Sequence, residues 1–243
     1  MMSRYEMRMM GILLLLMPLL IVISWSGLIS RFDYPDILRE PTSVILQQYD
    51  EGGITLKLYW AGMVLSSLLI IPVALSLYRL TNHANRSLSL TAAGIGITSA
   101  VFHVLGFSRW LFAVDYLAAQ YVGTDRLSAD QQWAIETSFN MLHMYLGVTI
   151  GETLGFLTMG IWAILTAVAL YRSRYIHAAL AVLSIGCGIG ILAGILEWAG
   201  WSYAVEINAI AYQLWILIIA YLGITFIVRK GWKLPVAGQE PLR

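Results

Sequence analysis

Six apolar stretches, each long enough to cross a lipid bilayer, fill most of this chain. A hydrocarbon core about 30 Å thick needs roughly 20 helical residues at about 1.5 Å per residue. Because lipid offers no hydrogen-bond partners, a crossing segment satisfies its own backbone as an α-helix. The sequence therefore predicts an all-α, polytopic transmembrane bundle with six membrane-spanning helices. We expect the spans at Met9–Ile29, Leu56–Tyr78, Ser89–Phe112, Thr149–Leu170, Ile176–Glu197 and Val205–Val228.

The composition leaves no room for a separate soluble domain. Of the 243 residues, 59% are hydrophobic and only 12% are charged, which is typical of a chain solvated mostly by lipid. No connection between the spans is long enough to fold alone, so we expect residues 1–243 to form a single transmembrane domain. The sequence contains no HExxH, GxSxG or nucleotide-binding motif, and we expect no nucleic acid partner.

The distribution of charge predicts how the chain is oriented. Basic residues concentrate on the cytoplasmic side of membrane proteins. One side of this chain carries ten basic and two acidic residues, whereas the other carries five basic and twelve acidic residues. We therefore expect both termini in the cytoplasm and extracytoplasmic loops at about residues 30–55 and 113–136. The ten basic residues are Arg4, Arg8, Arg79, Arg86, Arg172, Arg174, Arg229, Lys230, Lys233 and Arg243.

The first extracytoplasmic loop combines turns with a short amphipathic segment. Pro35 and Pro41 prevent a continuous helix across them. Beyond them, Thr42 is placed to cap a short helix, and Gly52-Gly53 frees the chain to enter the second span. We expect this helix to lie on the membrane surface, with a mobile loop as the alternative. Its apolar side chains are Val44, Ile45, Leu46 and Tyr49.

The fourth span begins well before the membrane. Ser128, followed by Asp130 and Gln131, is typical of a helix start, and helical periodicity continues to Leu170. This length exceeds one bilayer crossing. We expect the fourth helix either to project beyond the membrane or to break near Gly147–Gly151.

Two helices carry glycines at four-residue spacing. Glycine at this spacing lets helix backbones approach closely, where dispersion and weak contacts drive association. We expect tight packing within the bundle, with homodimer contact or an open groove as the alternatives. The glycines are Gly147, Gly151 and Gly155 in the fourth span and Gly186, Gly190 and Gly194 in the fifth.

Ionisable and polar side chains gather toward the extracytoplasmic ends of the third to sixth spans. A charge at the bilayer centre costs roughly 3 kcal/mol on insertion scales, so such a residue usually has a partner or a function. Arg109 is the cation best placed to pair with Glu152. The alternative is that these are interface residues that pair for solubility. We predict seven ligand-binding residues: His103, Arg109, His143, Glu152, Glu197, Glu206 and Gln213.

The histidines could instead bind a metal ion or a haem, which is the most specific alternative to a ligand-binding role. Two histidines and a carboxylate suit zinc or non-haem iron, and a histidine pair suits haem. His143 and Glu152 are nine residues apart, about 180° around a straight α-helix, so a site with His103 needs a break at the glycines. We assign no metal ligands and no catalytic residues, and the sequence identifies no cofactor.

Five short stretches carry a resemblance to a known family. They are Asp33-Tyr-Pro-Asp-Ile-Leu, Gly52-Gly53, Arg109-Trp110, Gly155 through Trp162, and Arg172-Ser173. Over most of its length the chain resembles an uncharacterised bacterial family of small multi-pass inner-membrane proteins, described as a domain of unknown function. The resemblance implies a bacterial inner (cytoplasmic) membrane protein of about six helices. It carries no established activity or ligand.

Polar side chains that gather at the extracytoplasmic ends of closely packed helices favour a binding protein over an enzyme. We expect it to bind a membrane lipid or a small amphiphilic ligand between the third to sixth helices. An intramembrane metal- or haem-dependent enzyme is one alternative, and a transporter or channel is another. The nearly apolar inner halves of the spans offer no continuous polar path for transport.

Overall fold

The computed structural model describes residues 4–123 and 127–228, and in those ranges it contains helices and connections but no strand. Two of the segments are π-helical (η2 and η3) and two are 3-10 helices (η1 and η4). The elements are α1 (Arg4–Phe32), η1 (Asp36–Arg39), α2 (Thr42–Thr81), α3 (Arg86–Arg109), η2 (Trp110–Val114), α4 (Asp115–Val122), α5 (Ala129–Leu142), η3 (His143–Leu154), α6 (Gly155–Arg172), α7 (Ala178–Ala193), η4 (Gly194–Ala199) and α8 (Ala204–Val228).

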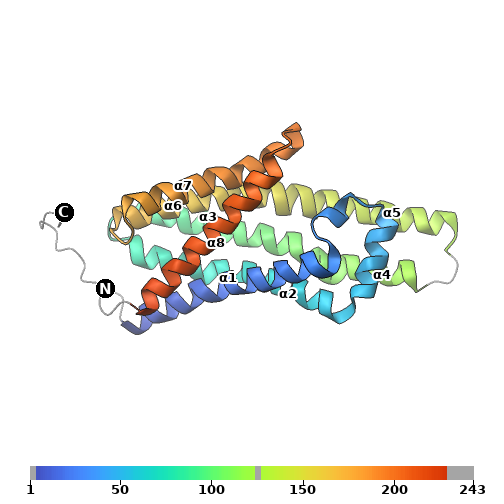
Figure 1. Ribbon diagram of the computed structural model, residues 1–243, viewed down its shortest axis with the longest axis horizontal. Helices are drawn as coiled ribbons and strands as arrows, with labels where there is room; N and C mark the ends of the chain where they lie inside the picture. The colour runs from blue at the N-terminus through green and yellow to red at the C-terminus, as the bar shows by residue number, and fades with distance from the viewer. Residues whose placement is uncertain (1–3, 124–126, 229–243) are drawn as a thin grey trace, which may run out of the picture.

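Six helical segments in the described ranges are long and apolar enough to cross a membrane, which confirms the predicted fold class. The start of α1 and the end of α8 lie at the same end of the bundle, while η1, α4 and α5 lie at the other (Figure 1). We call that other end the distal end. Four of the ten basic residues used to predict orientation, Arg229, Lys230, Lys233 and Arg243, lie outside the described residues.

The first loop folds onto the protein and not onto the membrane. α2 begins at Thr42 and kinks at Gly53, whose φ of 54° is a conformation that suits glycine. The expected apolar side of the segment before the kink is mostly buried among other side chains, so its predicted contact with the membrane surface is wrong. Its buried residues are Ile45, Leu46 and Tyr49. The Thr42 hydroxyl does not cap the helix but donates to the Asn140 side chain at 3.2 Å.

The second loop is also largely helical, because η2 and α4 continue α3 and α5 starts soon after. Ser128 caps α5 with Gln131 in a reciprocal capping box, as the sequence predicted. Residues 124–126 of this loop lie outside the described residues. The fourth span projects beyond the bundle at α5 (Figure 1) and does not break at the glycines. It continues through them as the π-helix η3.

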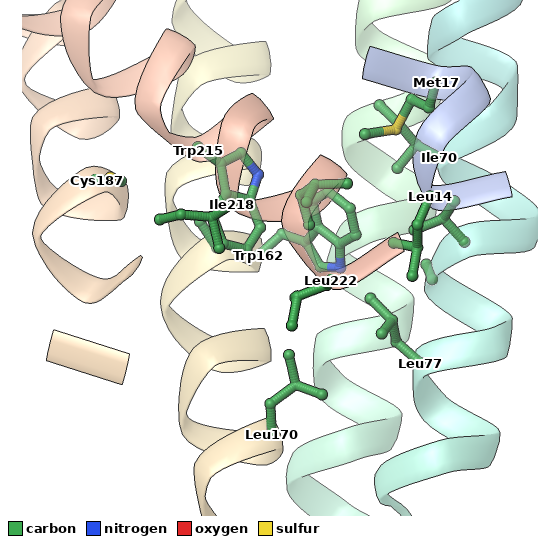
Figure 2. Close-up of a cluster of buried hydrophobic side chains, with 14 of the residues drawn as sticks. Leu14, Met17, Ile70, Leu77, Trp162, Leu170, Cys187, Trp215, Ile218 and Leu222 are labelled. Atoms are coloured by element: carbon green, nitrogen blue, oxygen red, sulfur yellow. The ribbon is translucent and has the colours of Figure 1, made fainter. Parts of the chain in front are cut away.

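Two hydrophobic clusters hold the bundle together. The larger contains side chains from the crossing helices, and Figure 2 shows Leu14, Trp162 and Trp215 among those gathered there. The second, at the distal end, is rich in aromatic rings. In it Trp60 stacks on Trp110 with ring centroids 4.6 Å apart and an interplanar angle of 6°. The distal cluster joins α1, α2, η2 and α5, so it fixes the end of α3 in place.

The predicted glycine stripes bring helices of the same chain together. A Cβ placed on Gly106 would lie 2.8 Å from the Gly151 Cα, so the backbones of α3 and η3 touch there. A Cβ on Gly190 would lie 2.5 Å from the Ala211 Cβ, so α7 and α8 pack closely as well. Gly186, in contrast, has open space around it. Contact of these glycines with a second copy of the chain stays a prediction.

Candidate functional site

Arg109, at the end of α3, is a buried charge with few partners. Its side chain is only 5% exposed, and its Nη1 donates a 2.6 Å hydrogen bond to the Gly106 carbonyl. The guanidinium carbon lies 5.2 Å from the centroid of the Trp110 ring, which gives a cation–π contact. The two ion pairs among the described residues are Arg39 with Asp36 and Lys57 with Asp115, so Arg109 has no carboxylate partner.

Gly147 makes room for the Arg109 guanidinium. A Cβ at Gly147 would lie 2.7 Å from the Arg109 Nη2. Any larger residue at this position would therefore displace the charged group. The close approach of Gly106 to Gly151 brings η3 near enough for this contact. Small residues thus place a buried cation between α3 and η3.

The π-helical geometry of η3 determines which of its side chains face Arg109. A π-helix closes i→i+5 hydrogen bonds and has about 4.4 residues per turn. The hydroxyls of Thr149 and Thr153 donate to carbonyls five residues earlier, consistent with this winding. Nine residues are then about two turns, so His143 and Glu152 lie on the same side of η3. The prediction of opposite sides was wrong because it assumed an α-helix.

The Arg109 charge acts on three side chains from other parts of the fold. It interacts electrostatically with Glu152 and His143 of η3 and with Tyr34 of the α1–η1 connection. We call Tyr34, Arg109, His143 and Glu152 the distal site. Arg109 and Glu152 do not approach within 4.0 Å, so the direct ion pair predicted from the sequence is absent. Glu152 itself makes no hydrogen bond or ion pair with the described residues.

Sequence reasoning missed Tyr34. It is 8% exposed, and its ring meets Trp60 edge-on at 5.1 Å. Burial raises the pKa of the Tyr34 phenol above its ordinary value, and the negative charge of Glu152 raises it further, while Arg109 lowers it. The phenol is therefore a neutral hydrogen-bonding group beside the two charges. Its position just before Pro35 pointed only to a turn.

His143 adds an unsatisfied polar atom to the distal site. Its ring stacks on Phe139 at 5.9 Å with an interplanar angle of 2°. The Nδ1 atom is buried and has no hydrogen-bond partner in the described part of the chain. A buried polar atom without a partner costs about 1–3 kcal/mol, so it is available to a ligand.

His103 belongs to a separate contact nearer the middle of α3. Its Nδ1 lies 2.8 Å from the Ser99 carbonyl, to which it must donate, so Nε2 is the acceptor. The Tyr212 hydroxyl of α8 lies 3.5 Å from Nε2. His103 thus contacts Ser99 and Tyr212, whereas His143 stacks on Phe139, so the two histidines do not share one site. No group of three or more His, Cys, Asp or Glu side chains in the described ranges is arranged to hold a metal ion.

The other three predicted residues lie at the surface. Glu197 is exposed and lies in η4, which packs against η3, so it borders the distal site. Glu206 and Gln213 on α8 are exposed, and no contact joins them to Arg109. Asn208 is instead the buried amide of α8, donating to the Ile191 carbonyl at 2.8 Å and filling the space beside Gly194.

A small cavity lies away from the distal site. It is bounded by α2, α3 and α6 and is lined by residues that include Ala74, Thr81 and Trp162. Ser173 donates to the Thr81 carbonyl beside it, and Thr81 donates to Ser89. This cavity is not the extracytoplasmic pocket that the sequence predicted.

The fold and the site together define a multi-pass helical membrane protein with a buried arginine and a partly buried glutamate toward its distal end. Residues 9–228 match the family described as a domain of unknown function, DUF4386, and the chain belongs to that family. This confirms the resemblance to an uncharacterised family. No curated protein and no solved structure matches the chain.

Proposed function

We propose that this protein binds a membrane lipid or similar amphiphile and holds the anionic part of its headgroup against Arg109. The observation that carries the proposal is a buried arginine whose side chain makes one hydrogen bond and no ion pair with the described residues. Taking a charge out of water costs several kcal/mol, which one hydrogen bond, a cation–π contact and the separated charge of Glu152 recover only in part. The planar guanidinium matches phosphate and carboxylate groups through paired N–H donors.

The path of α8 supports access from the surrounding lipid. α8 meets α1 at Gly11 and Gly223, where a Cβ on Gly11 would lie 2.7 Å from the Gly223 carbonyl oxygen. From that crossing α8 diverges from α1 toward the distal end (Figure 1). Its distal half exposes Ile210, Leu214 and Leu217, an apolar surface that acyl chains can cover.

We further propose that the protein lies in a bacterial cytoplasmic membrane with both termini in the cytoplasm and the distal site on the outer side. The asymmetry of basic residues supports this orientation. Reporter fusions after Arg86 and Arg174 should be cytoplasmic, and fusions after Asp50 and Trp201 should be extracytoplasmic. The opposite pattern at all four positions would invert the proposed orientation.

Lipid binding to purified, delipidated protein tests the proposed function. Native mass spectrometry with added phospholipids should show that Arg109→Gln weakens binding at least about tenfold, because one charge-assisted contact is lost. Arg39→Gln is the matched control, since Arg39 is an exposed cation of the same end, paired with Asp36. Arg109→Lys should bind with intermediate strength, because it keeps the charge but not the paired donors.

Elution volume and unfolding temperature without lipid establish that each variant is folded. Equal lipid binding by the wild type, Arg109→Gln and Arg39→Gln would contradict the proposal. Equal loss in Arg109→Gln and Arg39→Gln would also contradict it, because the effect would then not belong to the buried site.

A further inference from the structure

We propose that the headgroup recognised at the distal site is zwitterionic, with a phosphate held by Arg109 and a primary ammonium held by the carboxylates of Glu152 and Glu197. This inference rests on the proposed function and specifies its ligand. The shared chemistry is a phosphate joined by a short linker to a protonated primary amine. A phosphatidylethanolamine is the membrane lipid that carries it.

The distal site contains charges of both signs that form no ion pair with the described residues. Arg109 has no ion pair, and Glu152 has neither an ion pair nor a hydrogen bond with the described residues. The two groups interact electrostatically without touching. A ligand that satisfies only the arginine leaves the partly buried Glu152 without a partner. A ligand with both charges satisfies both residues.

A bound phosphate changes the net charge around Arg109. Once a phosphate neutralises Arg109, two carboxylates remain in the site, because η4 with Glu197 packs against η3 with Glu152 and the two side chains interact electrostatically. Like charges in a poorly solvated site repel strongly, so a purely anionic headgroup is disfavoured. An ammonium group placed between the carboxylates removes this repulsion.

The surroundings of the site suit a primary ammonium better than a quaternary one. A quaternary ammonium has no N–H donors and is usually bound by the open faces of several aromatic rings. The rings beside Arg109 do not provide such a cage, and Trp198, next to Glu197, is exposed and makes no contact with another ring of the described residues. Trp60 and Trp110 stack on one another, and Tyr34 and Phe32 pack edge-on against them. Carboxylates that accept hydrogen bonds instead match the three N–H donors of a primary ammonium.

The experiment compares three lipids with identical acyl chains on the full-length protein: phosphatidylethanolamine, phosphatidylcholine and phosphatidylglycerol. Phosphatidylethanolamine should bind about tenfold more tightly than either of the others, as expected for one charge-assisted hydrogen bond. In Glu152→Gln and Glu197→Gln, phosphatidylethanolamine should bind less tightly and phosphatidylglycerol more tightly. Opposite changes for two lipids cannot arise from misfolding, which weakens both. Glu206→Gln, an exposed carboxylate on α8, should change neither.

The outcomes separate this inference from the proposed function. Equal or tighter binding of phosphatidylglycerol in the wild type, with dependence on Arg109 retained, would overturn the zwitterionic headgroup and leave the proposed function intact. No Arg109-dependent binding of any lipid would overturn both. Free phosphoethanolamine forms a separate arm. If free phosphoethanolamine binds as tightly as phosphatidylethanolamine, the site recognises the zwitterion. The proposed function would then be wrong in requiring a lipid with acyl chains.

Discussion

Replacing Gly106 with alanine tests the close contact that builds the distal site. The added Cβ would lie 2.8 Å from the Gly151 Cα and 3.4 Å from the Leu146 carbonyl oxygen. Both are backbone atoms of η3, so the strain cannot be relieved by turning a side chain. Overpacking of this kind costs about 1–3 kcal/mol. Against this, alanine gains up to about 1 kcal/mol over glycine inside a helix.

Gly94→Ala, on the same helix, is the matched control. Nothing lies within 4 Å of a Cβ at Gly94, so this variant keeps the helix gain without the steric cost. The gain cancels in the comparison, and Gly106→Ala should be less stable than Gly94→Ala by about 1–3 kcal/mol. Reversible unfolding in mixed micelles, followed by far-ultraviolet circular dichroism, measures this difference. Equal stability of the two variants would refute the contact between α3 and η3.

Three further variants test individual contacts by the same unfolding measurement. Asn208→Ala should cost about 1 kcal/mol because it removes the hydrogen bond to Ile191, whereas the exposed Gln213→Ala should stay within about 0.5 kcal/mol of the wild type. Tyr212→Phe should cost no more than about 1 kcal/mol, since it removes one long hydrogen bond and leaves an acceptor unpaired; a gain in stability would contradict that bond. Tyr34→Phe should be less sensitive to alkali. Because the pKa of Tyr34 is raised on folding, wild-type stability falls above pH about 10, where only the unfolded chain loses this proton.

The transmembrane architecture could be predicted because the solvent permits few alternatives. In lipid, a long apolar segment must be a helix, so hydropathy alone identified the six spans. The extramembrane helices were harder to predict. Near Tyr49 the apolar side chains predicted an amphipathic helix correctly, but periodicity does not reveal whether lipid or protein covers it. In this protein the covering groups are aromatic rings of α1 and η2.

The candidate site was partly predictable for a similar reason. The cost of burying a charge made Arg109 and Glu152 conspicuous within apolar sequence. Which charges meet depends on helix winding, and no residue pattern in η3 indicated a π-helix. Tyr34 reaches the site through tertiary folding of a loop. Glu206 and Gln213 were included because they are polar, but the rotation of α8 turns them outward.

The π-helical winding of η3 links the fold to the proposed binding of a headgroup. Long π-helices are rare because their hydrogen-bond geometry is poorer than that of an α-helix, and π segments are frequent at functional sites. With α-helical winding, Glu152 would point away from His143 and from the arginine beside Gly147. As a π-helix, η3 presents an unsatisfied imidazole nitrogen and a carboxylate to the same buried cation. Packing of Gly106 against Gly151 alone does not require these polar groups to converge. Their convergence on an arginine that forms no ion pair with the described residues is what a headgroup-binding site requires.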